Sequence, residues 1–234
     1  MKKNIIIALI SFSTLALAQE KELKFGLKAF PALAWSRVEP EAWTDGNGIK
    51  YNYAANPAQF RGGFGIYADY YYNDNVAFNF GLNYIFNSSG YTITSSDNSI
   101  ASVEDKREYS IQYVQLPLAL KLISNEVVDN IKIYFSAGLA LNVTSGANVD
   151  GKSTYQANGS VNVTRYTSEI SLFALDFITS TGVEYELDNG MKLLLGVSYM
   201  HGLFDLNTRS EDRYKKSGFA VRNSLFALDV GIKF

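Results

Sequence analysis

The chain has 234 residues, with 21 basic and 23 acidic side chains and no cysteine. A net charge of −2 argues against nucleic-acid binding, and the lack of cysteine means that the fold is held without disulfides. Tyr and Phe are abundant, at 16 and 15 residues, while Pro is scarce at 4, which favours β structure.

The N-terminal segment has the pattern of a secretory signal peptide. Lys2 and Lys3 precede an apolar run, and that run ends at Ala16-Leu17-Ala18, a small-x-small cleavage motif before Gln19. The run is too short for a membrane-spanning helix. Because no cysteine lies near the motif, a lipid-anchored lipoprotein is excluded. We therefore expect export of the chain and removal of residues 1–18.

Eight later segments alternate apolar and polar residues, as β-strands do when their two faces meet different surroundings. Their lengths are near the ~9–11 residues that a tilted membrane strand requires. In the clearest segment, Val76, Phe78 and Phe80 lie on one face and Ala77 and Asn79 on the other. The predicted strands are approximately 23–35, 61–72, 76–86, 109–122, 131–143, 172–187, 191–203 and 226–234.

The connections between these segments alternate strictly between long and short. The long ones are 36–60, 87–108, 144–171 and 204–222, and the short ones are 73–75, 123–130 and 188–190. Outer-membrane barrels have short periplasmic turns and long extracellular loops, and their sheet must close on itself. The pattern predicts an all-β fold, an eight-stranded antiparallel up-and-down transmembrane β-barrel, with periplasmic termini. The predicted domains are a signal peptide (1–18) and an outer-membrane barrel with four long extracellular loops (19–234).

The last predicted strand ends in an aromatic residue. Its apolar face consists of Phe226, Leu228, Val230, Ile232 and Phe234. This face resembles the C-terminal assembly signal of bacterial outer-membrane barrels, which implies that the barrel-assembly machinery is a partner during insertion.

A soluble exported barrel of the lipocalin kind is the competing β fold, because alternation alone does not distinguish inside from outside. Three features favour lipid on the outside: the terminal Phe, the Gly- and Ser-rich polar face, and aromatic residues near strand ends. These aromatic residues are Tyr70, Tyr72, Tyr84, Phe86, Tyr185 and Tyr199.

Several motifs resemble the PorT-like outer-membrane barrels of Bacteroidota. The best match is Tyr113–Leu122, similar to the family pattern Y-[LV]-x-[IL]-P-[LI]-x-[LF]-K, although the family usually has Gly where this chain has Phe30. The resemblance implies a small, OmpX-like, non-porin barrel in the cell outer membrane of a Gram-negative cell. One family member is linked to the type IX secretion machinery, and many have no assigned role. Further matches are Phe25–Ala29, Tyr134–Gly138, Gly182–Tyr185 with Asn189-Gly190, and Tyr199–Leu203.

The single histidine, His201, is the natural candidate for a catalytic base in a lipid-modifying enzyme. However, alternation places His201 on the lipid or headgroup side, with Tyr199 and Leu203, whereas Ser198 faces inward. We therefore expect an interfacial histidine and no enzyme. No phosphate loop, metal cluster or nucleotide fingerprint is present, so no cofactor is expected, and Asp45-Gly-Asn-Gly48 fits a turn better than a Ca²⁺ loop.

The lumen of an eight-stranded barrel is just wide enough for side chains to fill it. We expect inward charges of both signs to pair there as a plug, because an unpaired buried charge costs several kcal/mol, about 3–5 when one partner is removed. The predicted lumen charge network is Lys24, Lys28, Asp69, Lys121, Lys132, Asp176, Glu184, Lys192, Asp229 and Lys233.

The long loops are the remaining candidates for function. Charged stretches at 104–108 and 209–216 suit either a rim facing lipopolysaccharide phosphates or a docking surface for envelope or secretion proteins. Trp43, Tyr51 and Tyr53 are of the type found at binding hot spots, and packing onto the barrel mouth explains them equally well. We therefore expect a structural or protein-interaction role in contact with outer-membrane lipid.

Overall fold

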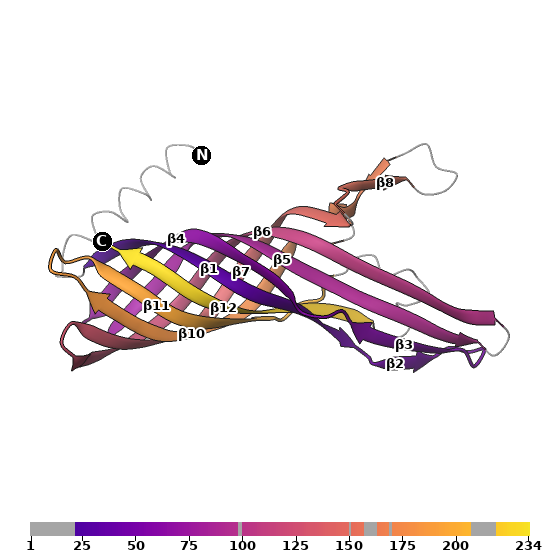
Figure 1. Cartoon of the computed structure of the whole chain (residues 1–234), viewed down its shortest axis with the longest axis horizontal. Coiled ribbons are helices and arrows are strands. Elements are labelled where there is room, and N and C mark those ends of the chain that lie inside the picture. Colours follow the sequence, from indigo (N-terminus) through magenta and orange to yellow (C-terminus); the bar gives the residue numbers. More distant parts are fainter. Residues whose placement is uncertain (1–21, 98–99, 150, 157–162, 169, 207–218) are drawn as a thin grey trace, which may run out of the picture.

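The computed structural model describes residues 22–97, 100–149, 151–156, 163–168, 170–206 and 219–234. The predicted signal peptide and its cleavage motif lie outside these ranges. Ten described strands form one antiparallel sheet, and eight of them close into a barrel because β1 pairs with β12 and β5 with β6 (Figure 1). The predicted eight-stranded up-and-down barrel is confirmed.

The strands of the barrel wall follow the chain order β1, β4, β5, β6, β7, β10, β11 and β12. Their bounds are β1 Leu23–Glu39, β4 Gln59–Asn73, β5 Val76–Asp97, β6 Ile100–Val128, β7 Ile131–Val149, β10 Phe173–Glu186, β11 Lys192–Gly202 and β12 Ala220–Lys233. The other elements are β2 Ala42–Thr44, β3 Lys50–Ala55, β8 Thr154–Gln156, β9 Val163–Arg165 and a short 3₁₀ helix, η1 Tyr166–Ser168.

The apolar face of the wall points outward. Leu118 and Phe78 are 67% and 50% exposed, whereas their neighbours Ala119 and Ala77 point inward and are 7% and 0% exposed. This arrangement suits a lipid-facing barrel and is the reverse of a lipocalin-like carrier, which would hold its apolar face inside. The alternation along each strand therefore has the predicted direction.

The terminal end is the end of the barrel where β1 begins and β12 ends, and its turns are short. Asp129-Asn130 joins β6 to β7 with Asn130 at φ 65°, and the β10–β11 turn has Gly190 at φ 81°. Asn and Gly tolerate this left-handed backbone region better than other residues. The connection between β6 and β7 is shorter than the predicted 123–130, because β6 continues to Val128 through two register shifts.

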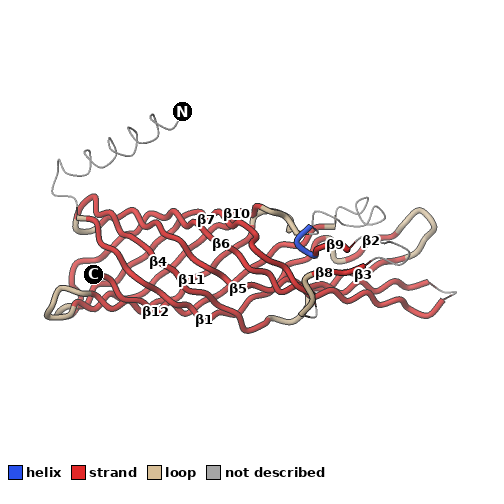
Figure 2. Tube along the Cα trace, turned by 90° about the horizontal axis from the view of Figure 1, so that it is seen from above, coloured by secondary structure: helices blue, strands red, loops and turns tan. Residues whose placement is uncertain are grey.

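The opposite, distal end carries a sheet that projects beyond the barrel (Figures 1 and 2). The predicted loop 87–108 is wrong: β5 and β6 remain paired through this stretch. β3 adds to β5, and β2 adds to β3. We call β2, β3, residues 87–97 of β5 and residues 100–108 of β6 the distal sheet.

The third long connection also contains regular structure. β7 continues to Val149, and β8 pairs with β9 as a separate two-stranded sheet before η1. The charged stretch 209–216 lies outside the described residues. Within the described ranges, no helix has the length and apolar character needed to cross a membrane.

Candidate functional site: the filled lumen and the distal sheet

Four charged side chains meet inside the barrel, nearer its terminal end. Asp69, Lys121, Glu184 and Lys233 come from β4, β6, β10 and β12, every second strand of the wall, and their charges alternate in sign. Lys121 Nζ lies 2.8 Å from Asp69 Oδ2 and 2.5 Å from Glu184 Oε1. Lys233 Nζ lies 3.0 Å and 2.7 Å from the same two oxygens. We call these four residues the charge square.

The charge square is deeply buried, and nearly all of its charged atoms have an ion-pair or hydrogen-bond partner. Its side chains are at most 3% exposed. Asn79 Nδ2 donates to Asp69 Oδ1 at 2.6 Å, and Lys233 donates to the Tyr71 hydroxyl at 2.7 Å. Lys121 Nζ also lies 4.6 Å from the centre of the Tyr134 ring. Two carboxylates and two ammonium groups sum to zero charge, which is the condition for burying them together.

Glycines allow two tyrosines to lie across neighbouring strands around this square. Gly182 and Gly196 form a directly opposed pair, and Tyr134 packs over both. A Cβ at Gly196 would lie 2.3 Å from the Tyr134 hydroxyl oxygen. Tyr67 packs in the same way over Gly26, its partner on β1. The two rings therefore lie against the wall beside the charge square. The alternation of residue types did not predict this packing of tyrosine over glycine.

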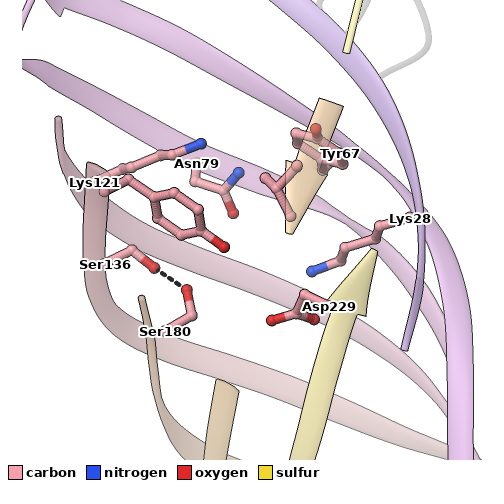
Figure 3. A pocket seen from close by; sticks show the side chains of 9 residues that line it. Lys28, Tyr67, Asn79, Lys121, Ser136, Ser180 and Asp229 are labelled. Atoms are coloured by element: carbon pink, nitrogen blue, oxygen red, sulfur yellow. Dashed lines mark hydrogen bonds between the residues drawn. The ribbon is translucent and has the colours of Figure 1, made fainter. Parts of the chain in front are cut away.

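The other six predicted lumen charges lie outside the charge square. Near the terminal end, Lys24 pairs with Glu22 and Lys192 with Glu186, both at 3.0 Å, and Lys132 occupies the inward position opposite Glu184. Lys28 and Asp229 line a cavity of about 40 Å³, where Figure 3 shows the Lys28 amine beside the Asp229 carboxylate. Asp176 belongs to a different polar layer, described next.

A ladder of side-chain amides crosses the lumen on the distal side of this cavity. Asn83 donates to Gln115 at 2.9 Å, Gln115 to Asn142 at 2.9 Å, and Asn142 to Asp176 at 2.7 Å. These four residues come from the consecutive neighbours β5, β6, β7 and β10. Of these four residues, only Asp176 belongs to the predicted lumen charge network. The three amides share its inward direction, and their mutual contacts depend on strand register.

Apolar side chains fill the lumen at and beyond the amide ladder. Phe30, Ile85, Tyr113, Met200 and Leu225 are all no more than 6% exposed. Phe30 faces Gly63 directly, and its ring occupies the space that a Cβ of Gly63 would need. The expected plug is therefore charged in one layer and apolar over much of its length.

The distal sheet has a small aromatic core. Phe219 lies between Tyr53 and Tyr91, with ring centroids 4.9 Å and 5.1 Å away. Trp43 stacks on Tyr51 at 5.7 Å. The aromatic residues of the predicted first loop therefore pack within the extension of the barrel.

The geometry around His201 does not form a nucleophile–base pair. His201 Nδ1 lies 3.0 Å from the Tyr199 hydroxyl on the outward face, whereas Ser198 points inward and is 8% exposed. Asp205 accepts the backbone N–H of Val221. Asp45 accepts the backbone N–H groups of Asn47 and Ile49, which is turn chemistry. The described residues include no group of three acidic or His side chains fit to hold a metal ion.

Several solved outer-membrane proteins are similar to this chain at low sequence identity. Neisserial surface protein A matches with a TM-score of 0.48 and 15% identity, over 89% of this chain and 95% of that one. Ail of Yersinia pestis, in complex with the heparin analogue sucrose octasulfate, matches with 0.39 and 10%, over 90% and 99%. The N-terminal barrel of Pseudomonas aeruginosa OprF matches with 0.36 and 14%, over 92% and 100%. These scores carry no functional argument.

Among curated proteins, no significant match was found. Residues 5–234, nearly the whole chain, match the family model described as outer membrane protein beta-barrel domain. The closed eight-stranded ring with its apolar outer face has the architecture that this family name denotes. The chain belongs to the outer-membrane β-barrel domain family.

Proposed function

We propose that this protein is a closed outer-membrane barrel that presents a rigid β-sheet at the cell surface for contact with another envelope protein. The observation that carries the proposal is the continuity of β5 and β6. They remain paired from Asn87–Ile111 to Ser95–Val103 without a register shift, so the distal sheet is a direct extension of the barrel wall. A continuous ladder holds a binding surface in a fixed orientation, which lowers the entropy lost on binding.

The barrel itself acts as an anchor and not as a porin. Its lumen holds the charge square, the amide ladder and the apolar plug in succession, which leaves little room for a solute. The role we infer is non-catalytic, since the outward His201 and the inward Ser198 are separated by the barrel wall.

The orientation we infer has the terminal end in the periplasm and the distal sheet outside the Gram-negative cell. Short turns at the terminal end and long excursions at the distal end support it, because outer-membrane barrels have this asymmetry. The signal-peptide pattern supports export, and the apolar face of the last strand suits the barrel-assembly machinery.

The partner class we infer is an envelope protein, with components of a secretion machinery as the first candidates. Support comes from the motifs shared with the PorT-like barrels of Bacteroidota, a group to which we assign the chain. The buried aromatic core of the distal sheet adds physical support, because it stiffens the surface that a partner would meet.

The test is affinity capture from mildly solubilised outer membranes. In the truncated variant, an Asn-Gly turn replaces residues 93–105 and joins Thr92 to Lys106, which face each other. An Asp188→Asn variant, altered in an exposed turn of the terminal end, serves as control. The proposal predicts that the parent and control proteins retain a stoichiometric envelope protein and that the truncated barrel, still heat-modifiable on gels, loses it. Recovery of the parent barrel alone, or retention of the partner by the truncated barrel, contradicts the proposal.

A further inference from the structure

A polar patch lies on the outward face of the barrel, at the distal edge of its apolar wall. Three neighbouring strands, β11, β12 and β1, contribute to it. We call it the basic patch. Its members are Trp35, Arg37, Tyr199, His201, Arg222 and Ser224.

Strand register brings these residues to three successive levels. Arg37 faces Arg222 directly, and Ser224 lies between Trp35 on one side and His201 on the other. One level closer to the terminal end, Phe226 lies between Leu33 and Tyr199. Leu33 and Phe226 are 49% and 46% exposed, so the apolar wall begins directly beneath the patch.

Internal contacts hold the patch in shape. Arg37 Nε donates to Ser224 Oγ at 3.1 Å, and Arg37 Nη2 donates to the carbonyl oxygen of Gly202 at 2.6 Å. The Tyr199 hydroxyl lies 3.0 Å from His201 Nδ1. Trp35 stacks on Tyr199, with ring centroids 6.1 Å apart and planes inclined by 23°. The guanidinium of Arg37 is therefore fixed in place before any ligand arrives.

The patch carries more positive charge than its carboxylate partner offsets. Like charges directly opposite each other on paired strands are destabilising. Among the described residues, Glu39 is the carboxylate that pairs with an arginine of the patch: it lies 2.7 Å from Arg222, and its side chain is 61% exposed. Arg222 Nε is buried and has no hydrogen-bond partner in the described part of the chain. An anion that reached both guanidinium groups would complete this arrangement.

We propose that the basic patch binds the phosphate of a phosphorylated glycolipid in the outer leaflet, of the lipopolysaccharide class. Arginine is suited to phosphate because its planar fork donates two parallel hydrogen bonds. The apolar wall below, with Leu33 and Phe226, lies where the acyl chains of the same molecule would run. Trp35 and Tyr199 lie at the boundary between the two, a position that amphipathic rings favour. This continuity favours a lipid over a soluble anion, and the inference rests on the proposed outward orientation of the distal end.

The test uses the purified barrel in detergent, so its result does not depend on orientation in the cell. The chain has two Trp residues, and a Trp43→Phe background leaves Trp35, inside the patch, as the single tryptophan, whose emission is followed selectively. This protein is titrated with diphosphorylated lipid A, with dephosphorylated lipid A, and with inorganic phosphate. Three variants are compared in the same background: Arg37→Gln with Arg222→Gln, Arg222→Gln alone, and Lys152→Gln, which removes one exposed positive charge elsewhere.

The parent and Lys152→Gln proteins are expected to bind diphosphorylated lipid A about tenfold or more tightly than the dephosphorylated lipid, because a hydrogen bond to a charged group has at least that effect. The double variant should lose this preference, and Arg222→Gln, which leaves the Arg37 contacts intact, should reduce it. Equal binding of the two lipids by the parent, or an unchanged preference in both arginine variants, overturns the proposal. The same fluorescence change with inorganic phosphate at equal concentration overturns the lipid assignment in favour of a soluble anion. Partner capture is measured separately, so its failure with lipid preference retained contradicts only the proposed function.

Discussion

Asp69 and Glu184 lie on opposite sides of the barrel and share the same two lysine partners. Lys121 and Lys233 each bridge the two carboxylates with N–O distances of 2.5–3.0 Å. Because the four residues alternate in sign on every second strand, each ion pair joins two strands that have another strand between them. The charge square therefore ties together strands that share no backbone hydrogen bonds.

Neutralising one corner of the square should destabilise the barrel strongly. In Glu184→Gln, both lysines would share Asp69 alone, and one buried positive charge would be left uncompensated. Breaking a buried pair in this way lowers the free energy of unfolding by about 3–5 kcal/mol. Urea unfolding of the refolded protein in detergent micelles measures the change, with the exposed Asp188→Asn as control.

Removing one acid and one lysine of the square together should lower the free energy of unfolding less than removing one charge alone. Glu184→Leu combined with Lys121→Met leaves the Asp69–Lys233 pair, at 3.0 Å, neutral on its own. The double variant is therefore expected to be more stable than Glu184→Gln. An unaltered unfolding midpoint in Glu184→Gln, or a double variant weaker than the single one, would refute the structural role of the square.

The glycine under Tyr134 should not tolerate a side chain. In Gly196→Ala, the new Cβ would meet the Tyr134 hydroxyl oxygen at 2.3 Å and the carbonyl oxygen of Thr181 at 2.7 Å. Overpacking of this kind lowers stability by about 1–3 kcal/mol. Gly46→Ala is the matched control, because no atom lies within 4 Å of a Cβ built there. Unfolding midpoints that fall equally in the two variants would contradict this role of Gly196.

Removing an aromatic side chain from the core of the distal sheet should lower the local stability of that sheet without lowering that of the barrel. Tyr53→Ala removes a side chain that is 4% exposed and packs on Phe219. We expect faster hydrogen exchange of the amides at 87–97, because local stability there depends on this small core, with little change in the barrel amides. Asn52→Ala, at the exposed neighbouring position on β3, is the control. Exchange that increases uniformly over sheet and barrel would contradict the separation.

The filled lumen predicts that the protein does not conduct. In planar lipid bilayers, the refolded barrel should give no stepwise current above that of protein-free membranes, because inward side chains such as Phe30 and Leu225 are 0% and 2% exposed. A general porin measured in the same bilayers provides the positive control. Stable, protein-dependent conductance steps would show that the lumen opens.

The barrel could be predicted from sequence because its physical signal is local. Each wall strand alternates between lipid and lumen, so residues such as Phe78 and Asn79 reveal their directions without knowledge of the rest of the fold. The distal sheet has no lipid-facing side. Its strands continue through Ser88, Thr92 and Thr94, which form the same backbone ladder without an apolar stripe, and the prediction therefore ended β5 at Phe86.

For the lumen residues, the sequence predicted which side chains point inward but not which of them contact one another. Alternation places Asp69 and Lys121 inside, but their pairing across 52 residues depends on strand register and on closure of the ring. The same dependence explains why Lys24 and Lys192 pair near the terminal end, apart from the square. The position of Phe30 could not be predicted either, because its ring fits only where Gly63 on the neighbouring strand has no side chain.

In the proposed arrangement, a closed barrel holds the distal sheet outside the cell. Since the chain has no cysteine, single cysteines at Gly46, in the β2–β3 turn, and at Asn189, in the β10–β11 turn, are specific reporters. Both positions are exposed. Intact cells treated with a membrane-impermeant maleimide should label Gly46→Cys, and Asn189→Cys should react only after lysis. Labelling of Asn189→Cys in intact cells, with Gly46→Cys protected until lysis, would place the distal sheet in the periplasm and contradict the proposed orientation.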